Sequence, residues 1–385
     1  MSARYEIWLC NPDGTRIADL MGETLLERTM SFTATRIAND IGTLTIEVPE
    51  TFDRALLRRD LIIQIWRAGD AASLSLFRPY FLRRWTFQTR RGETSLELHG
   101  RCPNDLLRRR VVTSAPGTLA ATKGGLYDGI PADDIMKEIV SEALIDATGG
   151  YGWPVPVYGT RVWPLFSIEA NAGAGPVLTN PVDVSYEYVL QTRERGALFQ
   201  VINEALRSAV DLYFDVVPAI ITGDQMTYIF RVRLGQPGQD ITSEGVLFSQ
   251  DRGNLTDCEL SYDYTAEENF IYGVKEAGPY DTKVNQRYTA ADHDASIWNR
   301  CEGTVDRDTK STGNYLRSKR GKVNFTASIT DTQGMQFGVD WHWGDKVRVR
   351  YQNFQIDAVI KAVTLQVDRN GKEKIGARLE YQGNA

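Results

Sequence analysis

Few residues of this 385-residue chain have the types and spacing that catalysis or metal binding requires. Its three histidines, His99, His293 and His342, stand alone in different segments. The paired carboxylates that glycoside hydrolysis needs could come from Asp133/Asp134, Glu267/Glu268 or Asp292/Asp294. Nothing in the sequence places two of these groups across one cleft. We therefore expect structural roles: His99 in a strand, His293 in a solvated loop, His342 in a packed corner, and Asp133 or Asp134 at a helix N-terminus.

The motifs of phosphate binding and of nucleophilic catalysis are missing from the sequence. No GxxxxGK[ST] loop and no GxSxG elbow occurs, and the GxG within residues 171–176 ends at a proline instead of opening a helix. The four cysteines form no CxxC pair, so we expect buried thiols and no zinc site. The sequence predicts no catalytic residue, no cofactor and no metal, and a protein that is not an enzyme.

The charge distribution argues against a strong phosphate binder. Residues 1–120 hold 17 Arg, no Lys and 14 acids (+3), residues 121–250 hold 8 basic and 16 acidic residues (−8), and residues 251–385 hold 19 and 20 (−1). Nucleic-acid binders usually show a clear basic excess. No apolar run is long enough to cross a bilayer, and the first residues lack the apolar core of a signal peptide. We expect no membrane insertion and synthesis in a cytoplasm.

Three arginine clusters each follow a pair of apolar residues. They are Arg58 and Arg59, Arg83 and Arg84, and Arg108, Arg109 and Arg110. Two interpretations stay open. One is a solvated rim with local ion pairs, and the other is an interface between subunits, where Arg is favoured over Lys. The absence of Lys from residues 1–120 favours the interface slightly, so these seven arginines are candidate subunit-interface residues.

The elements that must position these groups are mainly strands. Short apolar runs separated by turn residues dominate both ends of the chain, whereas helical spacing appears after Pro131 and over residues 195–209. The pattern predicts a mainly β fold with an α+β insert. We expect a first β-barrel domain over residues 1–112, a helix-containing middle segment over 113–240 with an extended loop at 149–183, and a second, related β-barrel domain over 241–385.

The two β-rich regions repeat one succession of elements. Asp60 leads into a strand, a long strand over 81–88, a glycine turn and a closing strand. Asp345 leads into a strand, a long strand over 359–367, a glycine turn and a closing strand. The alternative is that any two antiparallel meanders look alike. If the repeat is real, three chains in a closed ring present six similar modules, an arrangement that suits an adaptor between three-fold and six-fold objects.

Five short sequence motifs follow one another along nearly the whole chain, and their order is informative. They are residues 38–48 (ANDIG followed by IEV), 57–62 (LRRDLI), 100–109 (GRCPNDLLRR), 246–255 (VLFSQDRGNL) and 337–347 (FGVDWHWGDKV). Each is weak alone, but their order resembles the siphophage tail-tip (baseplate) hub proteins of the two-barrel type. The resemblance carries over no catalytic residue.

The resemblance implies a structural virion protein of the phage tail tip. Three copies would form a pseudo-six-fold ring that connects the tail tube or distal tail protein to the tip or central fibre. The implied partners are two further copies of the chain, those neighbours and the tape measure protein, with DNA passing the lumen without specific binding. Two alternatives stay open: a receptor- or carbohydrate-binding tail module, which would show exposed Trp and Tyr beside acids, and a tail-associated cell-wall hydrolase.

Overall fold

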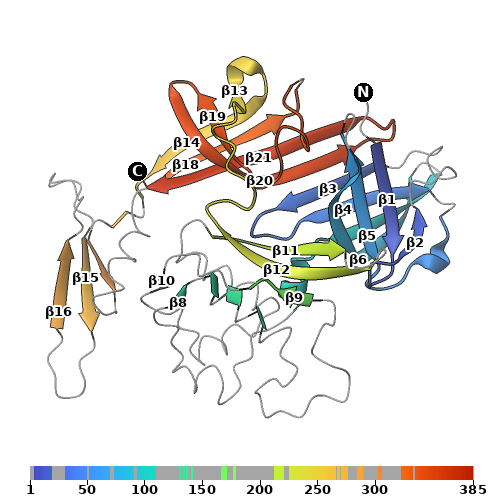
Figure 1. Ribbon diagram of the computed structural model, residues 1–385, viewed down its shortest axis with the longest axis horizontal. Helices are drawn as coiled ribbons and strands as arrows, with labels where there is room; N and C mark the ends of the chain where they lie inside the picture. Colours follow the sequence, from blue (N-terminus) through green and yellow to red (C-terminus); the bar gives the residue numbers. More distant parts are fainter. Residues whose placement is uncertain are drawn as a thin grey trace, which may run out of the picture.

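The computed structural model describes most of both ends of the chain and parts of its middle. The described residues are 4–19, 31–49, 52–69, 73–90, 93–109, 130–131, 133–134, 136–137, 140–141, 166–170, 177–178, 212–220, 225–265, 267–268, 270–275, 284–289, 302–305, 322–332 and 334–384. The predicted helix over 195–209 lies outside them, as does most of the loop predicted at 149–183. As predicted, the fold is mainly β, and a 13-stranded sheet organises it (Figure 1).

The N-terminal part of this sheet is called the first unit. It consists of β1 (Arg4–Cys10), β2 (Arg16–Asp19), β3 (Ser31–Ile37), β4 (Thr43–Pro49), β5 (Ile62–Ala68), β6 (Ser75–Arg90) and β7 (Glu93–Arg101), with the 3-10 helix η1 (Arg54–Leu56) before β5. Its strand order is β3-β4-β7-β6-β5-β1-β2, and every pairing is antiparallel. The short helix α2 (Asp105–Arg108) follows β7.

The C-terminal part is called the second unit. It consists of β13 (Leu247–Ser249), β14 (Leu255–Asp263), β18 (Lys322–Thr330), β19 (Lys346–Tyr351), β20 (Phe354–Val367) and β21 (Glu373–Asn384), with η2 (Gln250–Arg252) before β14. Its strand order is β14-β18-β21-β20-β19-β13. All pairings are antiparallel except that of β13 with β19, which is parallel.

The two units share one strand order. The strands β3, β4, β7, β6 and β5 of the first unit correspond to β14, β18, β21, β20 and β19 of the second, with the same neighbours and directions. A β-bulge interrupts β6 between Leu82 and Arg84, and another interrupts β20 between Ile360 and Ala362. Because bulges are specific local features, their matching positions support a true repeat over a chance likeness of two meanders.

The structure shifts the predicted alignment of the repeat by one residue. Leu82 N–H donates to Leu61 O at 2.7 Å, and Ile360 N–H donates to Asp345 O at 2.9 Å, so Asp345 is equivalent to Leu61. Asp60 is therefore equivalent to Gly344, not to Asp345. Both have positive φ, 62° and 88°, which Asp tolerates among non-glycine residues. The two aspartates that the sequence pairs thus occupy different positions.

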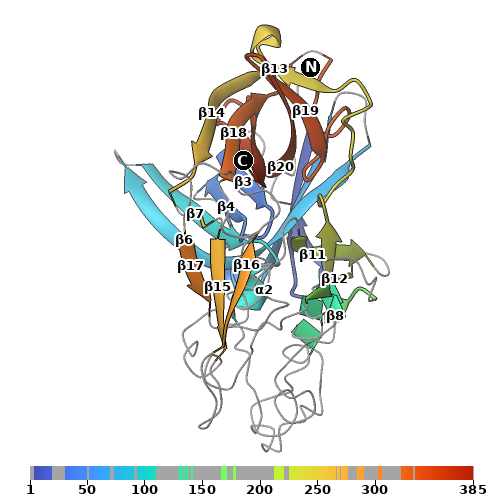
Figure 2. The same ribbon diagram turned by 90° about the vertical axis from the view of Figure 1, so that its left-hand side faces the viewer.

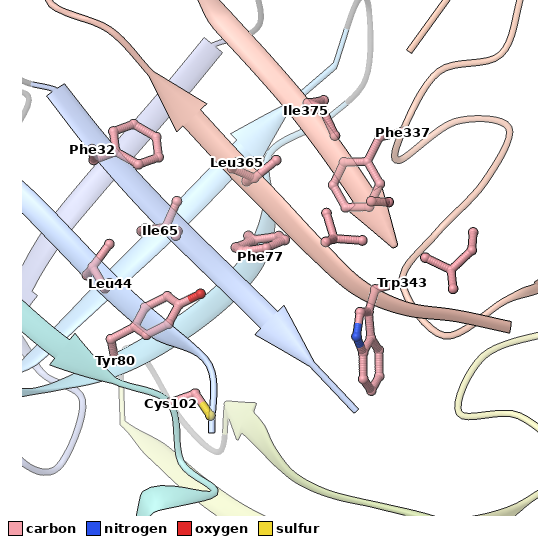
Figure 3. Close-up of a cluster of buried hydrophobic side chains, with 14 of the residues drawn as sticks. Phe32, Leu44, Ile65, Phe77, Tyr80, Cys102, Phe337, Trp343, Leu365 and Ile375 are labelled. Atoms are coloured by element: carbon pink, nitrogen blue, oxygen red, sulfur yellow. The ribbon is translucent and has the colours of Figure 1, made fainter. Parts of the chain in front are cut away.

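Both units contribute side chains to one hydrophobic core. Phe32, Ile65 and Tyr80 come from the first unit, and Phe337 and Leu365 from the region of the second (Figure 3). All five are at most 8% exposed. Buried residues alternate with partly buried ones along strands such as β18 and β19, which explains how one face of each strand reaches this core.

Smaller sheets lie outside the 13-stranded sheet. In the middle segment, β11 (Leu212–Ile220) pairs with β12 (Met226–Leu234), β12 pairs in parallel with β9 (Phe166–Ile168), and β8 (Ile130–Pro131) pairs with β10 (Val177–Leu178). Residues 133–134, 136–137 and 140–141 are helical, where the sequence predicts a helix. In the C-terminal region, β15 (Phe270–Lys275) pairs with β16 (Val284–Thr289) and β17 (Glu302–Val305).

Candidate assembly interface

The strands β20 and β3 join the second unit to the first. The long strand β20 uses its first half, up to Val359, to pair with β19, and on the same edge its last residues pair with β3. The register places Ala362 opposite Ile37, Val363 opposite Arg36 and Thr364 opposite Thr35. Ala38 N–H also donates to Lys361 O at 2.8 Å, at the β20 bulge. The pairing of β20 with β3 thus shows, within one chain, how two such units associate.

Ion pairs reinforce this junction. Arg67 of β5, which is 8% exposed, donates from Nε to Glu373 Oε1 at 2.7 Å and from Nη2 to Glu373 Oε2 at 3.2 Å. Arg67 Nη1 also donates to Phe337 O at 2.9 Å. On the exposed side, Arg369 binds Glu47 of β4. Because bidentate Arg–carboxylate pairs fix orientation as well as distance, these contacts hold the units in one arrangement.

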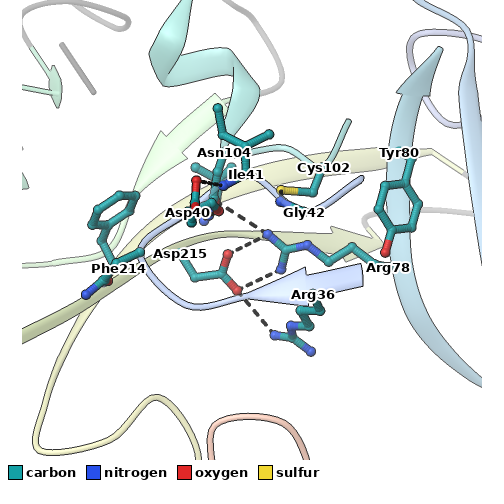
Figure 4. A network of polar contacts seen from close by, with 12 residues as sticks. Arg36, Asp40, Ile41, Gly42, Arg78, Tyr80, Cys102, Asn104, Phe214 and Asp215 are labelled. Atoms are coloured by element: carbon teal, nitrogen blue, oxygen red, sulfur yellow. Dashed lines mark hydrogen bonds and ion pairs between the residues drawn. The ribbon is translucent and has the colours of Figure 1, made fainter. Parts of the chain in front are cut away.

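A buried charge network ties the middle segment to the same junction (Figure 4). Arg78 Nη1 donates to Asp215 Oδ2 at 2.7 Å, and Arg36 Nη2 donates to the same oxygen at 3.2 Å. Asn104 Oδ1 accepts from Val216 N–H at 2.8 Å and from Arg78 Nη2 at 3.4 Å. Arg78 and Asp215 are 2% and 6% exposed, so the pair is nearly free of water.

The electrostatics of the network follow from burial and pairing. Burial alone would raise the pKa of the Asp215 carboxyl, but the charges and hydrogen bonds of Arg78 and Arg36 hold that pKa below its ordinary value. Burial would lower the pKa of Arg78, and the Asp215 carboxylate raises it instead. Both groups are therefore charged at neutral pH, and each depends on the other for compensation.

The candidate interface arginines fall into two sets. Arg83 donates to Asp105 Oδ2 at 2.8 Å and also binds Asp60, which Arg109 contacts at 3.2 Å. Arg83 and Arg109 thus meet at Asp60, the local ion-pair arrangement that was one of the two predicted alternatives. These contacts join the β6 bulge, the turn before β5 and the end of α2.

The other arginines point to solvent. Arg58, Arg59, Arg84 and Arg108 are exposed. Arg58 Nη2 donates to Asn11 Oδ1 at 3.3 Å, and Arg84 Nε donates to Thr86 Oγ1 at 3.1 Å. Arg110 lies outside the described residues. The structure therefore leaves the interface role of the exposed set as a proposal.

The isolated candidates for chemistry are not brought together. His99 Nε2 of β7 lies 3.5 Å from Glu97 Oε2, and this nitrogen is buried without a hydrogen-bond partner in the described part of the chain. The His342 side chain is 60% exposed, so the expectation of a packed corner is wrong; its hydrogen bond to Asp345 raises its pKa. His293 and Asp292/Asp294 lie outside the described residues. Glu267 and Glu268 lie between β14 and β15.

Asp133 and Asp134 are the first described residues of the helix that the sequence predicts after Pro131. Asp133 is buried within the helical residues and lies 3.3 Å from Lys137 Nζ, four residues along, while Lys137 also donates to Ala170 O at 3.0 Å.

Cys258 is half-buried, unlike the buried Cys10 and Cys102, so the expectation of buried thiols fails for Cys258. Within the described ranges, no group of three His, Cys, Asp or Glu side chains could hold a metal, and no helix is long and apolar enough to span a membrane.

Local sequence patterns do not mark most of the residues that organise the junction. Arg78 and Asp215 are 137 positions apart, and Arg67 and Glu373 are 306 apart, so no local spacing relates them. One signal was available. Arg78 lies in an apolar run, between Phe77 and Pro79-Tyr80, where a charge needs a buried partner.

Comparisons with known proteins relate nearly the whole chain to a family of siphovirus proteins, and its fold to that of tail proteins of known structure. A family model described as siphovirus ReqiPepy6 Gp37-like protein matches residues 6–379. The fold is similar to that of a tail protein from Neisseria meningitidis MC58, with a TM-score of 0.52 and 13% identity, covering 98% of this chain and 96% of that one. It is also similar to the 43 kDa tail protein of prophage MuSo2 from Shewanella oneidensis, with a TM-score of 0.52, 10% identity and 97% of each chain covered. No curated protein sequence matches the chain.

Proposed function

Because the chain belongs to the siphovirus ReqiPepy6 Gp37-like protein family, we propose that it is a structural hub of a siphophage tail tip. The family membership confirms the predicted relationship to siphophage tail proteins. In the proposal, three copies form a ring in which each copy contributes two sheet units. The ring joins the tail tube or distal tail protein on one side to the tip or central fibre on the other.

The repeated strand order carries this proposal. One chain contains two units with the same order and a bulge at the same place, and β20 and β3 bind one unit to the other. Closed rings of identical chains are the usual form of symmetric assembly, and three chains with two units each supply six related units. The domain boundaries proposed with this arrangement are residues 1–112, 113–240 and 241–385.

The proposed partners follow from the position of such a ring. Besides two further copies of the chain, they are the distal tail or tube protein, the tape measure protein, and the tip or fibre protein. DNA passes the lumen without specific contacts, which fits a chain with a net charge of −6. The location is the virion tail tip, after synthesis in the host cytoplasm.

A structural role without catalysis is part of the same proposal. The candidate carboxylate Asp133 is buried against Lys137, where it cannot reach a polysaccharide. A carbohydrate-binding module should show exposed Trp and Tyr beside acids. None of the described tryptophans is exposed, whereas Tyr262 and Tyr264 are exposed beside Asp263. A zymogram on cell-wall polymer tests this part: no clearing is expected, and clearing that a single carboxylate substitution abolishes would contradict it.

Averaged electron micrographs of assembled virions test the position of the protein. Antibodies or a fused tag on the chain should label the distal end of the tail, at the junction of tube and tip. Label along the tail shaft, or on the capsid, would overturn the hub assignment.

A further inference from the structure

The first unit contains a strand edge whose equivalent in the second unit is occupied. In the second unit, residues Ala362 to Val367 of β20 pair with β21 on one edge and with β3 on the other. In the first unit, the equivalent part of β6, from Arg84 onward, pairs with β7, and no described strand pairs with its other edge. The β6–β7 hairpin projects from the side of the molecule (Figure 2).

The strand that would complete the equivalence is β14. By the shared strand order, β14 corresponds to β3, the strand that β20 binds, and β14 is the last strand at its end of the described sheet. The pairings with β18 and β4 make Glu259 equivalent to Thr35, Leu260 to Arg36 and Ser261 to Ile37. Within the described part of one chain, β3 binds β20, whereas β14 binds only β18 along its length.

Burial distinguishes the occupied edge from the open one. Val363 and Leu365 of β20, which face the core beside β3, are both 0% exposed. Their equivalents in β6 are Trp85, which is only partly buried, and Phe87, which is 46% exposed. On β14, Tyr262 is 51% exposed. Exposed aromatic side chains beside an open strand edge are typical of an interface.

Charge favours the same pairing. The open part of β6 carries the exposed Arg84, and the Arg83 cluster lies beside it. The outer strand β14 carries Asp257, Glu259 and Asp263, all exposed. In the register of β20 with β3, Arg84 would stand opposite Ser261 and diagonally across from Glu259 and Asp263, within reach of a long side chain.

We propose that β6 of one copy pairs, antiparallel, with β14 of a second copy. Arg84 stands opposite Ser261, Trp85 opposite Leu260, and Thr86 opposite Glu259, in the register that joins β20 to β3 within the chain. At the bulge, Tyr262 N–H of the second copy donates to Arg83 O, as Ala38 N–H donates to Lys361 O. This inference depends on the proposed ring, and it identifies β6 and β14 as the surfaces through which neighbouring copies would close the ring.

Engineered disulfides test the register. In a full-length Cys258→Ser background, Thr86→Cys is combined with Glu259→Cys, and the assembled tail or purified oligomer is oxidised. We expect covalent oligomers on a non-reducing gel, and mass spectrometry should detect a disulfide-linked peptide that joins β6 to β14 through the two introduced thiols. The single variants, Thr86→Cys or Glu259→Cys alone, should give no such peptide and no ladder.

The chain itself supplies the matched control. Thr364 and Thr35 face each other in the internal junction. Thr364→Cys combined with Thr35→Cys should therefore form a disulfide within one chain, without covalent oligomers on the gel. If that control closes and the oligomer shows no disulfide between β6 and β14, the pairing is wrong, while the ring stands. A chain that is monomeric in the virion, by cross-linking and mass measurement, overturns both. Protection of β6 by a different tail protein instead, seen as a cross-link to that protein, also overturns the pairing.

Discussion

The guanidinium of Arg36 lies 3.7 Å from the ring centroid of Trp343 while its Nη2 donates to Asp215. Arg36 belongs to β3, Trp343 to the corner before β19, and Asp215 to β11. A single side chain of the first unit therefore contacts both the second unit and the middle segment. The contact makes the relative position of the three parts depend on one small, largely buried cluster.

The two arginines of this cluster should contribute unequally to stability. Arg78→Met leaves the buried Asp215 with one partner and should cost about 3–5 kcal/mol. Arg36→Met removes a longer hydrogen bond and the cation–π contact, and should cost about 1–2 kcal/mol. Urea unfolding of the purified chain measures both. Equal losses would show that the bidentate Arg78 pair is not the principal one.

The low pKa of Asp215 predicts an acid-sensitive contribution to stability. A carboxyl whose folded pKa is below its unfolded value of 3.8 stabilises the fold above that value, and this contribution is lost as the pH falls through the folded pKa. Asp215→Asn should lower stability at pH 7 and flatten its decline below about pH 4. Asp257→Asn, on exposed β14, controls for loss of a surface charge. An unchanged acid slope in Asp215→Asn would contradict the network.

Gly344 should tolerate a side chain less well than another glycine of the same conformation. A Cβ on Gly344 would lie 2.8 Å from Gly238 N and 2.9 Å from Pro237 Cβ, whereas a Cβ on Gly371, with φ of 74°, would meet nothing within 4 Å. Gly371→Ala adds backbone strain alone, about 1 kcal/mol, and Gly344→Ala adds a clash with backbone, for about 3 kcal/mol or more. Thermal unfolding measures the loss of stability in the two variants. Equal decreases in melting temperature would contradict the crowding around Gly344.

Charge reversal should weaken the proposed contact between β6 and β14 and then restore it. Arg84→Glu places an acid diagonally across from Glu259 and Asp263, and should weaken association about threefold to tenfold. Adding Glu259→Arg to the same chain should recover most of the loss. Sedimentation velocity of the full chain measures the association, with Lys372→Glu, in the exposed turn between β20 and β21, as a control away from this edge. A double variant weaker than either single would argue against the register.

The sequence predicted the strands and their repeated order because both depend on local patterns. Alternating apolar residues mark β4 and β19, and turn glycines mark the hairpin ends. The predicted alignment of the two units was wrong by one residue, because it paired Asp60 with Asp345, the two aspartates. In the structure Asp60 is equivalent to Gly344, and the two residues have the same positive φ although their types differ.

The charged junction could not be predicted in the same way. Arg78 with Asp215 and Arg67 with Glu373 meet only after the sheets have assembled, and no periodicity links residues so far apart in the chain. The arginine clusters were visible, but the partners of Arg83, Asp60 and Asp105, became clear only from the turn and the helix that carry them.

The most direct test of the central claim is the symmetry of the assembled protein at the tail tip. Cryo-electron microscopy of isolated tails, refined without imposed symmetry, should show three copies of the chain around the axis and six sheet units alternating between first and second. A ring of six copies, a single copy, or density for the chain away from the axis would contradict the hub assignment.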